Sequence, residues 1–307
     1  MPTPIILDCD PGHDDAIALL LALASPEVKL LGVTTTYGNQ TLDKTTANAI
    51  RVLEFVKRTD VPVAAGAERP LTRELVVAAH VHGESGLDGP ALPPAREKPA
   101  SQDAVAFLVD RIRASPQPVT LVPTGPLTNT ARYLDAHGPE GVERIVLMGG
   151  SIAEGNYTPA AEFNTWCDPE AAQRVFSTGL EVTMIGLDVT HRAILGPAQE
   201  QRFRDAGRIG TFVAELNAFF SRYHRATYGW DGSPIHDAVA VAYVIRPELV
   251  GTVHRNVEVE LESELCRGRT VVDRWSRTVR PPNAHVGVRI DADAFFDLLV
   301  ERIATLG

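Results

Sequence analysis

The stretch PIILDCDPGHDDAIALLLALA, residues 4–24, joins an apolar strand to an apolar helix through a turn that is crowded with carboxylates. Its first residues are apolar, and Pro11 and Gly12 supply the turn signal that ends a strand. The apolar residues 16–24 are too few to cross a bilayer, which needs about 20, so they predict a buried helix. A strand followed directly by a buried helix is the first unit expected of an α/β fold.

The same unit recurs along the chain. Further short apolar runs, each closed by a turn signal, alternate with helical stretches and occupy residues 28–39, 61–66, 118–125, 143–150 and 181–188. Both alternate positions of these runs are apolar, as expected for strands that helices cover on both faces. The sequence therefore predicts an α/β fold with an open, mostly parallel, Rossmann-like central sheet flanked by helices.

Other segments carry the signals of helices and of a hairpin. Residues 41–59 repeat apolar side chains near the helical period, and residues 168–179 begin with an Asp-Pro pair and end on glycine, as a capped helix does. Strands are expected between residues 252 and 290, with a small β-hairpin near the C-terminus at ELCRGRTVVD, residues 264–273. Residues 291–307 predict a closing amphipathic helix, and we expect residues 1–307 to form one domain.

Composition excludes several classes of function. The chain has 307 residues, 44% of them hydrophobic, and a formal net charge of −10 without a basic block, which disfavours nucleic acid as a partner. Its start lacks a basic, apolar leader pattern, and no stretch is long enough to span a membrane. Three cysteines, widely spaced and without a CxxC pair, fit reduced thiols better than disulfides or a zinc site. We therefore expect a cytoplasmic enzyme.

Polar side chains follow the predicted strands, where ligands bind in open α/β sheets. They are Asp8, Asp10, Asn39, Thr124, Asn156, Glu162 and Asn164. The densest group is DCDPGHDD, residues 8–15, in which acids of the first helical turn could simply complement the helix dipole. That use needs one aspartate rather than four, and crowded carboxylates repel unless a cation or proton relieves them. A bound hard metal ion is the simpler interpretation.

Three further segments are candidates for the same site. In SPIHDAVAVAY, residues 233–243, Asp237 could cap a helix or complete a metal shell, and His236 could be a loop residue or donate a proton to a leaving group. PTGPLTN, residues 123–129, is a turn whose bent backbone could aim a carbonyl at a cation. AEFNTWCDPE, residues 161–170, is either a surface loop with two core aromatics or a strip of hydroxyl-binding side chains.

The Gly/Pro-rich stretch from residue 68 to residue 100 is longer than an ordinary connection, and such loops are usually functional or mobile. It contains HVHGESGLDG, residues 80–89, which resembles a metal cluster but has no cysteine. Because oxygen ligands are already abundant elsewhere, we interpret this segment as a lid over a sugar rather than a zinc site.

Taken together, these motifs resemble the inosine–uridine-preferring nucleoside hydrolase family over nearly the whole chain. DCDPGHDDAIALLLAL is close to that family's signature. The further matches follow in the family's order and with similar spacing, and they are VTTTYGNQT, HGESGLDG, PTGPLTN, VLMGG, GNYTPAAEFN and IHDA. The resemblance implies hydrolysis of the N-glycosidic bond of purine or pyrimidine ribonucleosides, in nucleoside salvage, by a homodimer or homotetramer.

The resemblance also implies roles for individual residues. Asp10, Asp15 and Asp237 would bind Ca²⁺ together with the backbone carbonyl of Thr124. Asp10 would also act as the general base toward water, and His236 would donate a proton to the departing base. The residues expected to bind the substrate are Asp14, Asn39, His82, Met148, Asn156, Glu162, Asn164 and Tyr228. His13, inside the signature, receives no role.

Residues 219–232, FFSRYHRATYGWDG, should border the base pocket. The aromatic and basic side chains there, Tyr223, Arg225, Tyr228 and Trp230, could stack on a nucleobase or could be ordinary helix-end packing. The sequence leaves the preferred base open.

Two other functions compete with this interpretation. DCD after a first strand also occurs in phosphatases of the haloacid-dehalogenase type, but those expect Thr or Val shortly after the second aspartate, where this chain has PGHDD. A catalytically silent nucleoside-binding protein on the same fold is the second alternative, and the intact Asp10 and His236 disfavour it.

Overall fold

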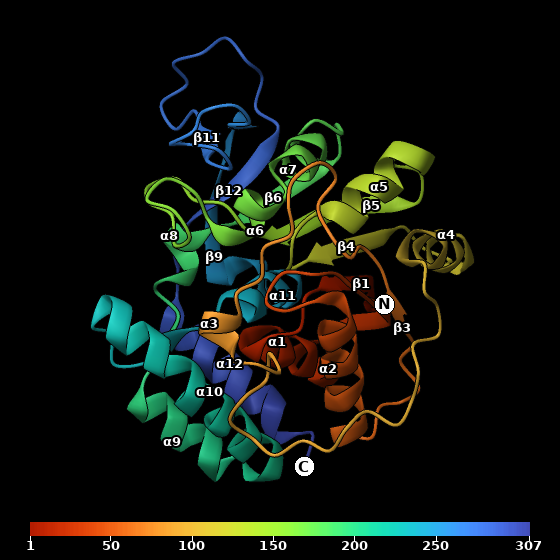
Figure 1. The fold of residues 1–307 in the computed structure, drawn as a ribbon, viewed down its shortest axis with the longest axis vertical. Coiled ribbons are helices and arrows are strands. Elements are labelled where there is room, and N and C mark those ends of the chain that lie inside the picture. Colours follow the sequence, from red (N-terminus) through yellow and green to blue (C-terminus); the bar gives the residue numbers. More distant parts are fainter.

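A computed structural model describes all residues, 1–307, and is built around an eight-stranded sheet (Figure 1). Its strands are β1 (Thr3–Cys9), β2 (Val28–Thr35), β3 (Val63–Ala65), β4 (Val119–Pro123), β5 (Val142–Met148), β6 (Glu181–Ile185), β9 (Val250–Arg255) and β12 (Ala284–Ile290). Two small antiparallel pairs lie outside it, β7 (Ile194–Leu195) with β8 (Ser233–Pro234) and β10 (Val257–Val259) with β11 (Thr270–Val272).

The helices connect and flank these strands. They are α1 (His13–Ala24), α2 (Leu42–Phe55), α3 (Ala79–His82), α4 (Ala104–Ala114), α5 (Thr128–His137), α6 (Phe163–Cys167), α7 (Pro169–Phe176), α8 (Leu187–Thr190), α9 (Pro197–Asp205), α10 (Gly207–Tyr228), α11 (His236–Ile245), the 3₁₀ turn η1 (Pro247–Leu249) and α12 (Ala292–Ala304). None of the helices is both long and apolar enough to traverse a membrane.

The strand order is β3-β2-β1-β4-β5-β6-β12-β9, and every neighbouring pair is parallel except β12 with β9. The predicted open, mostly parallel sheet flanked by helices is therefore confirmed. After β1 the chain first builds outward through β2 and β3 and then returns to the other side of β1 with β4. The carboxyl ends of β1 and β4 thus flank the switch point at which ligands bind in such sheets.

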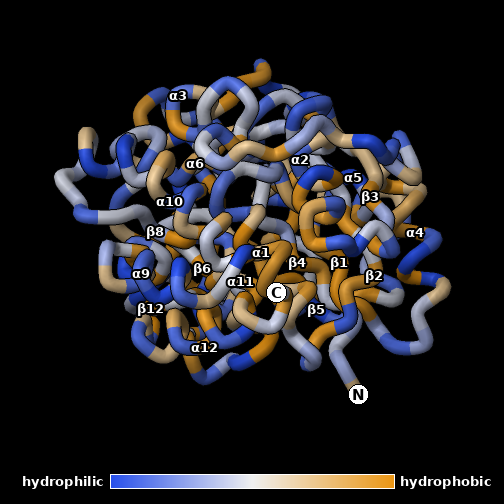
Figure 2. Tube along the Cα trace, turned by 90° about the horizontal axis from the view of Figure 1, so that it is seen from below, coloured by the Kyte–Doolittle hydropathy of each residue, from blue (hydrophilic) through white to orange (hydrophobic).

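Both faces of the sheet are covered, which explains why its strands are apolar at successive positions. On β1, Ile5 and Leu7 pack into a core shared with α1, α2, α10, α11 and α12, whereas Ile6 packs on the opposite side with α4, α5 and α7. Figure 2 shows the hydrophobic residues concentrated along the central strands and α1, with hydrophilic residues toward the periphery. The buried α1 predicted from residues 16–24 belongs to the larger of these cores.

Several local predictions are also met. Asp168 caps α7 by accepting a hydrogen bond from the backbone N–H of Ala171, with Pro169 in the first turn. The stretch from residue 68 to residue 100 contains only the single turn α3. The small hairpin near the C-terminus is present, but its first strand lies earlier than residues 264–273 because residues 260–269 form a wide loop between β10 and β11.

Candidate active site

A cavity opens at the carboxyl ends of the strands. Of the thirteen residues that the sequence analysis assigned to the site, all except Asp10 and Asp15 line it: Asp14, Asn39, His82, Thr124, Met148, Asn156, Tyr228, Glu162, Asn164, His236 and Asp237. Asp10 and Asp15 are buried, and both bond directly to the cavity-lining Asn39. The fold thus brings together segments from both ends of the chain.

Asp8, the first acid of the DCD motif, does not contribute to the cavity. Its Oδ1 accepts hydrogen bonds from Thr34 Oγ1 at 2.7 Å and Asn129 Nδ2 at 2.8 Å, and its Oδ2 accepts one from Thr130 Oγ1 at 3.0 Å. Burial raises its pKa, and these bonds oppose that rise. Asp8 therefore ties β1 to β2 and α5.

Asp10 is held differently. Its Oδ2 accepts the backbone N–H of Asn39 at 2.7 Å, while its Oδ1 is buried and has no hydrogen-bond partner. The backbone comes close on this side, because a Cβ atom on Gly125 would lie 2.5 Å from that Oδ1. A buried carboxylate oxygen without a donor is costly unless another group, such as a cation, satisfies it.

Three other carboxylates form a compact cluster beside the cavity. One oxygen each from Asp14, Asp15 and Asp237 lie within 4.8 Å of one another. Asp15 is anchored by Gly12 N, by Asn39 Nδ2 at 2.9 Å and by Thr124 Oγ1 at 2.9 Å. The sequence analysis named Asp10 rather than Asp14 as the third carboxylate around the cation, and the tightest cluster in the structure contains Asp14.

Electrostatics within this group favour a cation. Burial raises the pKa of Asp14 to about 8, and the neighbouring charge of Asp15 adds to that rise. Burial, followed by the charges of Asp14 and Asp15, holds the pKa of Asp237 well above its ordinary value. The pKa of Asp10 is also raised well above its usual range, first by burial and then by Asp15. Four carboxylates so placed cannot all ionise at neutral pH without a compensating positive charge.

The residue chemistry fits Ca²⁺, which takes carboxylate and carbonyl oxygens. Carboxylates dominate the group, and the carbonyl of Thr124 follows β4 on the same side of the sheet. That carbonyl accepts a hydrogen bond from Asn164 Nδ2 at 2.7 Å, which leaves its second lone pair available. No cysteine lines the cavity, so the donor set is that of a hard ion.

Glu162, Asn164 and Asn156 form one polar wall. Glu162 caps α6, and its carboxylate accepts the backbone N–H groups of Gly150, Asn164 and Thr165 at 2.9–3.1 Å. Asn156 Oδ1 accepts the backbone N–H of Phe163 at 2.9 Å. These bonds fix the wall while leaving further polar atoms to meet hydroxyl groups of a ligand.

His236 begins α11, and its Nδ1 lies 2.7 Å from Thr190 Oγ1. Burial, and then the neighbouring His191 and His224, hold the pKa of His236 well below its ordinary value. The ring is therefore neutral at pH 7 and carries a single N–H. Thr190 was not singled out by the sequence analysis, although it lies shortly after the carboxyl end of β6, where functional residues are expected.

His82 and His13 meet behind the cavity. His13 is fully buried, its Nδ1 lies 3.2 Å from His82 Nδ1, and its Nε2 lies 2.7 Å from the carbonyl oxygen of Asp88. The His13 ring also stacks on Phe219 and Phe220 at centroid distances of 5.3 Å. Burial lowers the pKa of His13 to about 4. His13, which lines no part of the cavity, thus fastens the 80–89 segment to α1 and α10.

Aromatic side chains close the cavity on the side of α10. Tyr223, His224 and Tyr228 reach it, and so does His191, the C-cap residue of α8, whose ring lies beside that of Tyr228 with the centroids 6.3 Å apart. Tyr228 stacks on Trp230 at 4.6 Å, so Trp230 supports the wall from behind. Arg225 instead pairs with Asp231 at the exposed surface. Of the four base-pocket candidates, the structure places Tyr223 and Tyr228 at the cavity.

Other lining residues escaped the sequence analysis. They are Ala78, His80, Val81, Tyr157, Phe163, His191, Phe220 and His224. All of them except His191 fell inside segments that had been noted, but nothing in the local pattern showed that these particular side chains would face the cavity.

Comparison with known proteins gives a consistent result. A family model described as inosine-uridine preferring nucleoside hydrolase matches residues 5–297. A pyrimidine-specific ribonucleoside hydrolase RihA of Enterobacter sp. is 54% identical, with 99% of this chain and 98% of the relative covered, and one of Salmonella paratyphi B is 53% identical, with 99% of each covered. The purine-preferring ribonucleoside hydrolase of Gardnerella vaginalis superposes with a TM-score of 0.92 at 33% identity, covering 99% of both chains.

Proposed function

Because the chain belongs to the inosine-uridine preferring nucleoside hydrolase family, and is thus a ribonucleoside hydrolase acting on N-glycosyl bonds, we propose that it cleaves pyrimidine ribonucleosides with Ca²⁺ as cofactor. The observation that carries the calcium proposal is the unpartnered, buried Oδ1 of Asp10 beside three clustered carboxylates. A phosphatase of the haloacid-dehalogenase type is excluded by the family match over residues 5–297.

The chemistry explains why so many carboxylates serve one reaction. A C–N glycosidic bond breaks through an oxocarbenium-like state, which needs an activated water, a stabilised sugar cation and a neutralised leaving base. When bound, Ca²⁺ would lower the pKa of a coordinated water and hold two neighbouring hydroxyls of the sugar. We assign Asp10, Asp15, Asp237 and the Thr124 carbonyl to hold it.

The remaining roles belong to the chain itself. Asp10 Oδ1, the oxygen without a donor, accepts the proton of the attacking water. The hydroxyls of the ribose are bound by Asp14 and Asn39 on one side and by the wall of Asn156, Glu162 and Asn164 on the other. These contacts orient the sugar, and the surrounding carboxylates favour its developing positive charge.

His236 is the proton donor in this proposal. We place the hydrogen of its neutral ring on Nε2, with the Thr190 hydroxyl donating to Nδ1, so that the N–H is available to the departing base. His82, Met148 and Tyr228 also line the cavity and would contact the substrate. Tyr223 and Tyr228 offer the base an aromatic wall.

The pyrimidine preference is supported by the relatives that share more than half of their residues with this chain and are named pyrimidine-specific. Uridine, cytidine, inosine and adenosine should be compared by the ribose they release, with and without a calcium chelator. We expect uridine and cytidine to be cleaved at least about tenfold more efficiently than inosine, a difference of about 1.4 kcal/mol in transition-state binding. Equal rates for all four would reject the preference, and full activity in chelator would reject the metal.

Calcium should also change how stability depends on pH. The raised pKa of Asp14, about 8, means that the folded metal-free protein keeps a proton that the unfolded chain releases near pH 4. The chelated protein should therefore become less stable as pH rises from 5 to 8. Calcium at about a hundredfold excess over its Kd should raise the free energy of unfolding by about 2.7 kcal/mol. At pH 8 this corresponds to a rise in Tm of roughly 5 °C or more.

Thermal unfolding followed by circular dichroism at matched ionic strength measures both effects. A smaller calcium-induced rise in Tm is expected at pH 5, where the carboxylates are protonated. A chelated protein that gains stability between pH 5 and pH 8, or a larger calcium effect at pH 5, would contradict the proposed metal site.

The proposal has three further parts. They are a role in nucleoside salvage, a cytoplasmic location and a homodimeric or homotetrameric state.

A further inference from the structure

His13 is a buried polar side chain to which the reaction proposed above gives no role. It is the first residue of α1 and is fully buried. Burying an imidazole is unfavourable unless its nitrogens find hydrogen-bond partners. Both nitrogens of His13 have partners, and each partner belongs to residues 80–89, which we call the lid segment. Three residues of the lid segment, His80, Val81 and His82, line the cavity.

The Nε2 atom of His13 anchors the far end of the lid segment. It lies 2.7 Å from the carbonyl oxygen of Asp88, and because a carbonyl only accepts, Nε2 donates this hydrogen bond. The lid segment is also closed on itself, since the Asp88 carboxylate accepts the backbone N–H groups of Glu84 and Ser85 at 3.0 and 3.1 Å. His13 thus ties α1 to a loop that its own contacts already order.

The Nδ1 atom of His13 instead meets a side chain of the cavity. It lies 3.2 Å from Nδ1 of His82, and the backbone N–H of His13 points to the same atom at 3.3 Å. The His82 ring is confined further, because a Cβ atom on Gly12 would lie 2.5 Å from its Nδ1 and its centroid lies 5.0 Å from that of Phe220. The other nitrogen of His82, Nε2, bonds to no group of the chain and is not among the buried atoms that lack a partner, so it is open to the cavity.

His82 lies at the end of the cavity that would receive the base. Burial contributes most to holding the pKa of His82 well below its ordinary value, and nearby histidines, His236 among them, add to the effect. His82 is thus a neighbour of the proposed proton donor. A side chain beside the departing base fixes where the base lies relative to that donor, and small displacements of reacting groups slow reactions by up to about a hundredfold.

Given the role proposed above for His236, on which this inference rests, we propose that His13 is a positioning residue with a separate task for each ring nitrogen. Through Nδ1 it fixes the ring of His82, and so the place of the base against the proton donor. Through Nε2 it holds the lid segment over the bound nucleoside. Phenylalanine would keep the stacking of His13 on Phe219 and Phe220, so packing alone does not explain the histidine.

Two amide substitutions separate the two tasks. The short amide of asparagine reaches the place of Nδ1 but not Asp88, whereas the longer amide of glutamine reaches the place of Nε2. In the calcium-loaded enzyme, His13→Asn should free the lid segment and keep His82 oriented, so KM for uridine should rise at least about fivefold with kcat within about threefold of wild type. His13→Gln should keep the lid segment and release His82, so kcat should fall about tenfold and KM should change less than about threefold.

The leaving group distinguishes positioning from general damage to the fold. Because p-nitrophenolate leaves without a proton, kcat for p-nitrophenyl riboside should stay within about threefold of wild type in His13→Gln. His13→Asn should raise KM for both substrates, because the lid segment covers either. His13→Phe keeps the stacking and loses both bonds, so with uridine it should show the higher KM and the lower kcat together. Equal slowing of both substrates by His13→Gln would show a merely structural role and would overturn the proposal.

Two measurements report the tasks without any turnover. Hydrogen exchange followed by mass spectrometry should show faster exchange of residues 80–89 in His13→Asn than in wild type or His13→Gln. Crystal structures should show the His82 ring turned in His13→Gln and unchanged in His13→Asn. Variants that do not differ in either measurement would overturn the proposal. A wild-type protein that cleaves no uridine would refute the proposed function instead, and these two measurements would still decide whether His13 orients His82 and the lid segment.

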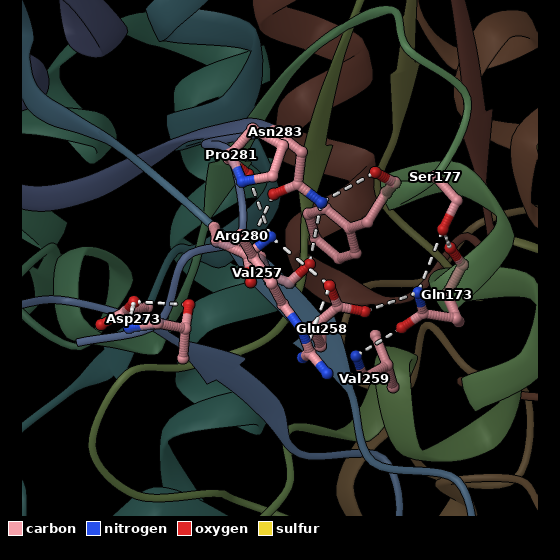
Figure 3. Close-up of polar contacts among 12 residues, drawn as sticks. Gln173, Ser177, Val257, Glu258, Val259, Asp273, Arg280, Pro281 and Asn283 are labelled. Carbon is pink, nitrogen blue, oxygen red and sulfur yellow. Dashed lines mark hydrogen bonds and ion pairs between the residues drawn. The ribbon is translucent and has the colours of Figure 1, made fainter. Parts of the chain in front are cut away.

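A polar contact far from the cavity provides the structural control. Asn283 accepts the backbone N–H of Val257 at 2.7 Å and donates to the carbonyl oxygen of Phe176 at 2.9 Å, so it fastens the hairpin of β10 and β11 to α7 (Figure 3). It lines no part of the cavity. Asn283→Leu should therefore lower Tm but leave kcat and KM for both substrates within about twofold of wild type.

Circular dichroism establishes that each variant is folded at the assay temperature. A loss of kcat in Asn283→Leu as large as that in His13→Gln would show that any loss of stability slows uridine, and would overturn the proposal.

Discussion

Replacing Asp10 with alanine is expected to lower kcat for uridine by at least about a thousandfold, which corresponds to about 4 kcal/mol of lost transition-state stabilisation. The substitution removes the buried Oδ1 that has no donor in the protein, and with it both the proposed proton acceptor and one ligand of the cation. General-base removal alone accounts for roughly a hundredfold to ten-thousandfold. Release of ribose from uridine at saturating calcium measures the effect.

The fold should survive this change. Asp10 contributes one hydrogen bond, to the backbone N–H of Asn39, and its burial already raises its pKa well above the ordinary value. Without metal, alanine therefore removes an unfavourable buried carboxylate, and Tm should stay within a few degrees of the wild-type value. Turnover close to that of the wild-type enzyme would eliminate the proposed mechanism.

Asp8→Asn is the matched control, since Asp8 belongs to the same motif and is equally buried. Its carboxylate accepts from Thr34, Asn129 and Thr130, so the amide disrupts that network and should cost about 1–3 kcal/mol of stability. Below the melting temperature, kcat should remain within about threefold of wild type. Asp8→Asn is thus expected to lower stability and leave kcat nearly unchanged, whereas Asp10→Ala is expected to abolish most of kcat and leave stability nearly unchanged.

This contrast also shows what the sequence could and could not predict. The apolar run of residues 4–7, and similar runs along the chain, are sufficient to predict the sheet and its helical layers, because burial on both faces leaves no polar alternation in the strands. The local sequence does not show which of the two aspartates, Asp8 or Asp10, belongs to the active site. The hydrogen-bond donors to the Asp8 carboxylate include Asn129 and Thr130 of α5, which are more than a hundred residues away in the sequence.

The same limit applies to the walls of the site. Residues after the strands, such as Asn39 and Thr124, were predictable because the carboxyl ends of parallel strands share one edge. His191 and His224 were not, since they reach the cavity only through the way α8 and α10 pack over it. Asp14, which was assigned to the sugar, lines the cavity and also lies within the carboxylate cluster. The sequence does not show this second position, because it depends on side-chain direction within one helical turn.

At the C-terminal hairpin, the sequence predicted the reversal of the chain but not the position of its first strand. The hairpin predicted at residues 264–273 correctly indicated a reversal of the chain, which includes Gly268 at a φ of +81°, but the strand before it begins at Val257. The intervening loop is stabilised by Glu260, whose carboxylate accepts the backbone N–H groups of Glu262 and Ser263 at 2.9 Å. Side chains that bond to nearby backbone extend a loop in ways that strand propensity does not capture.

His236→Ala is expected to divide substrates by the basicity of their leaving groups. For uridine, kcat/KM should fall by at least about a hundredfold, because the departing base needs a proton in the transition state. For p-nitrophenyl riboside it should stay within about threefold, because p-nitrophenolate leaves without one. Parallel assays of the same enzyme preparation, at the same calcium concentration, measure both values.

Thr190→Val provides the control for the tautomer. It removes the hydroxyl that lies 2.7 Å from Nδ1 while keeping the imidazole and the shape of the side chain. The hydrogen of the ring is then free to move to Nδ1, where it faces away from the base, so uridine should be slowed about tenfold and p-nitrophenyl riboside little. Because His236 also packs beside His191 at the cavity wall, its loss could act by shape alone. In that event His236→Ala would slow both substrates together while Thr190→Val, which keeps the imidazole, would slow neither, and the proton would have to come from another group.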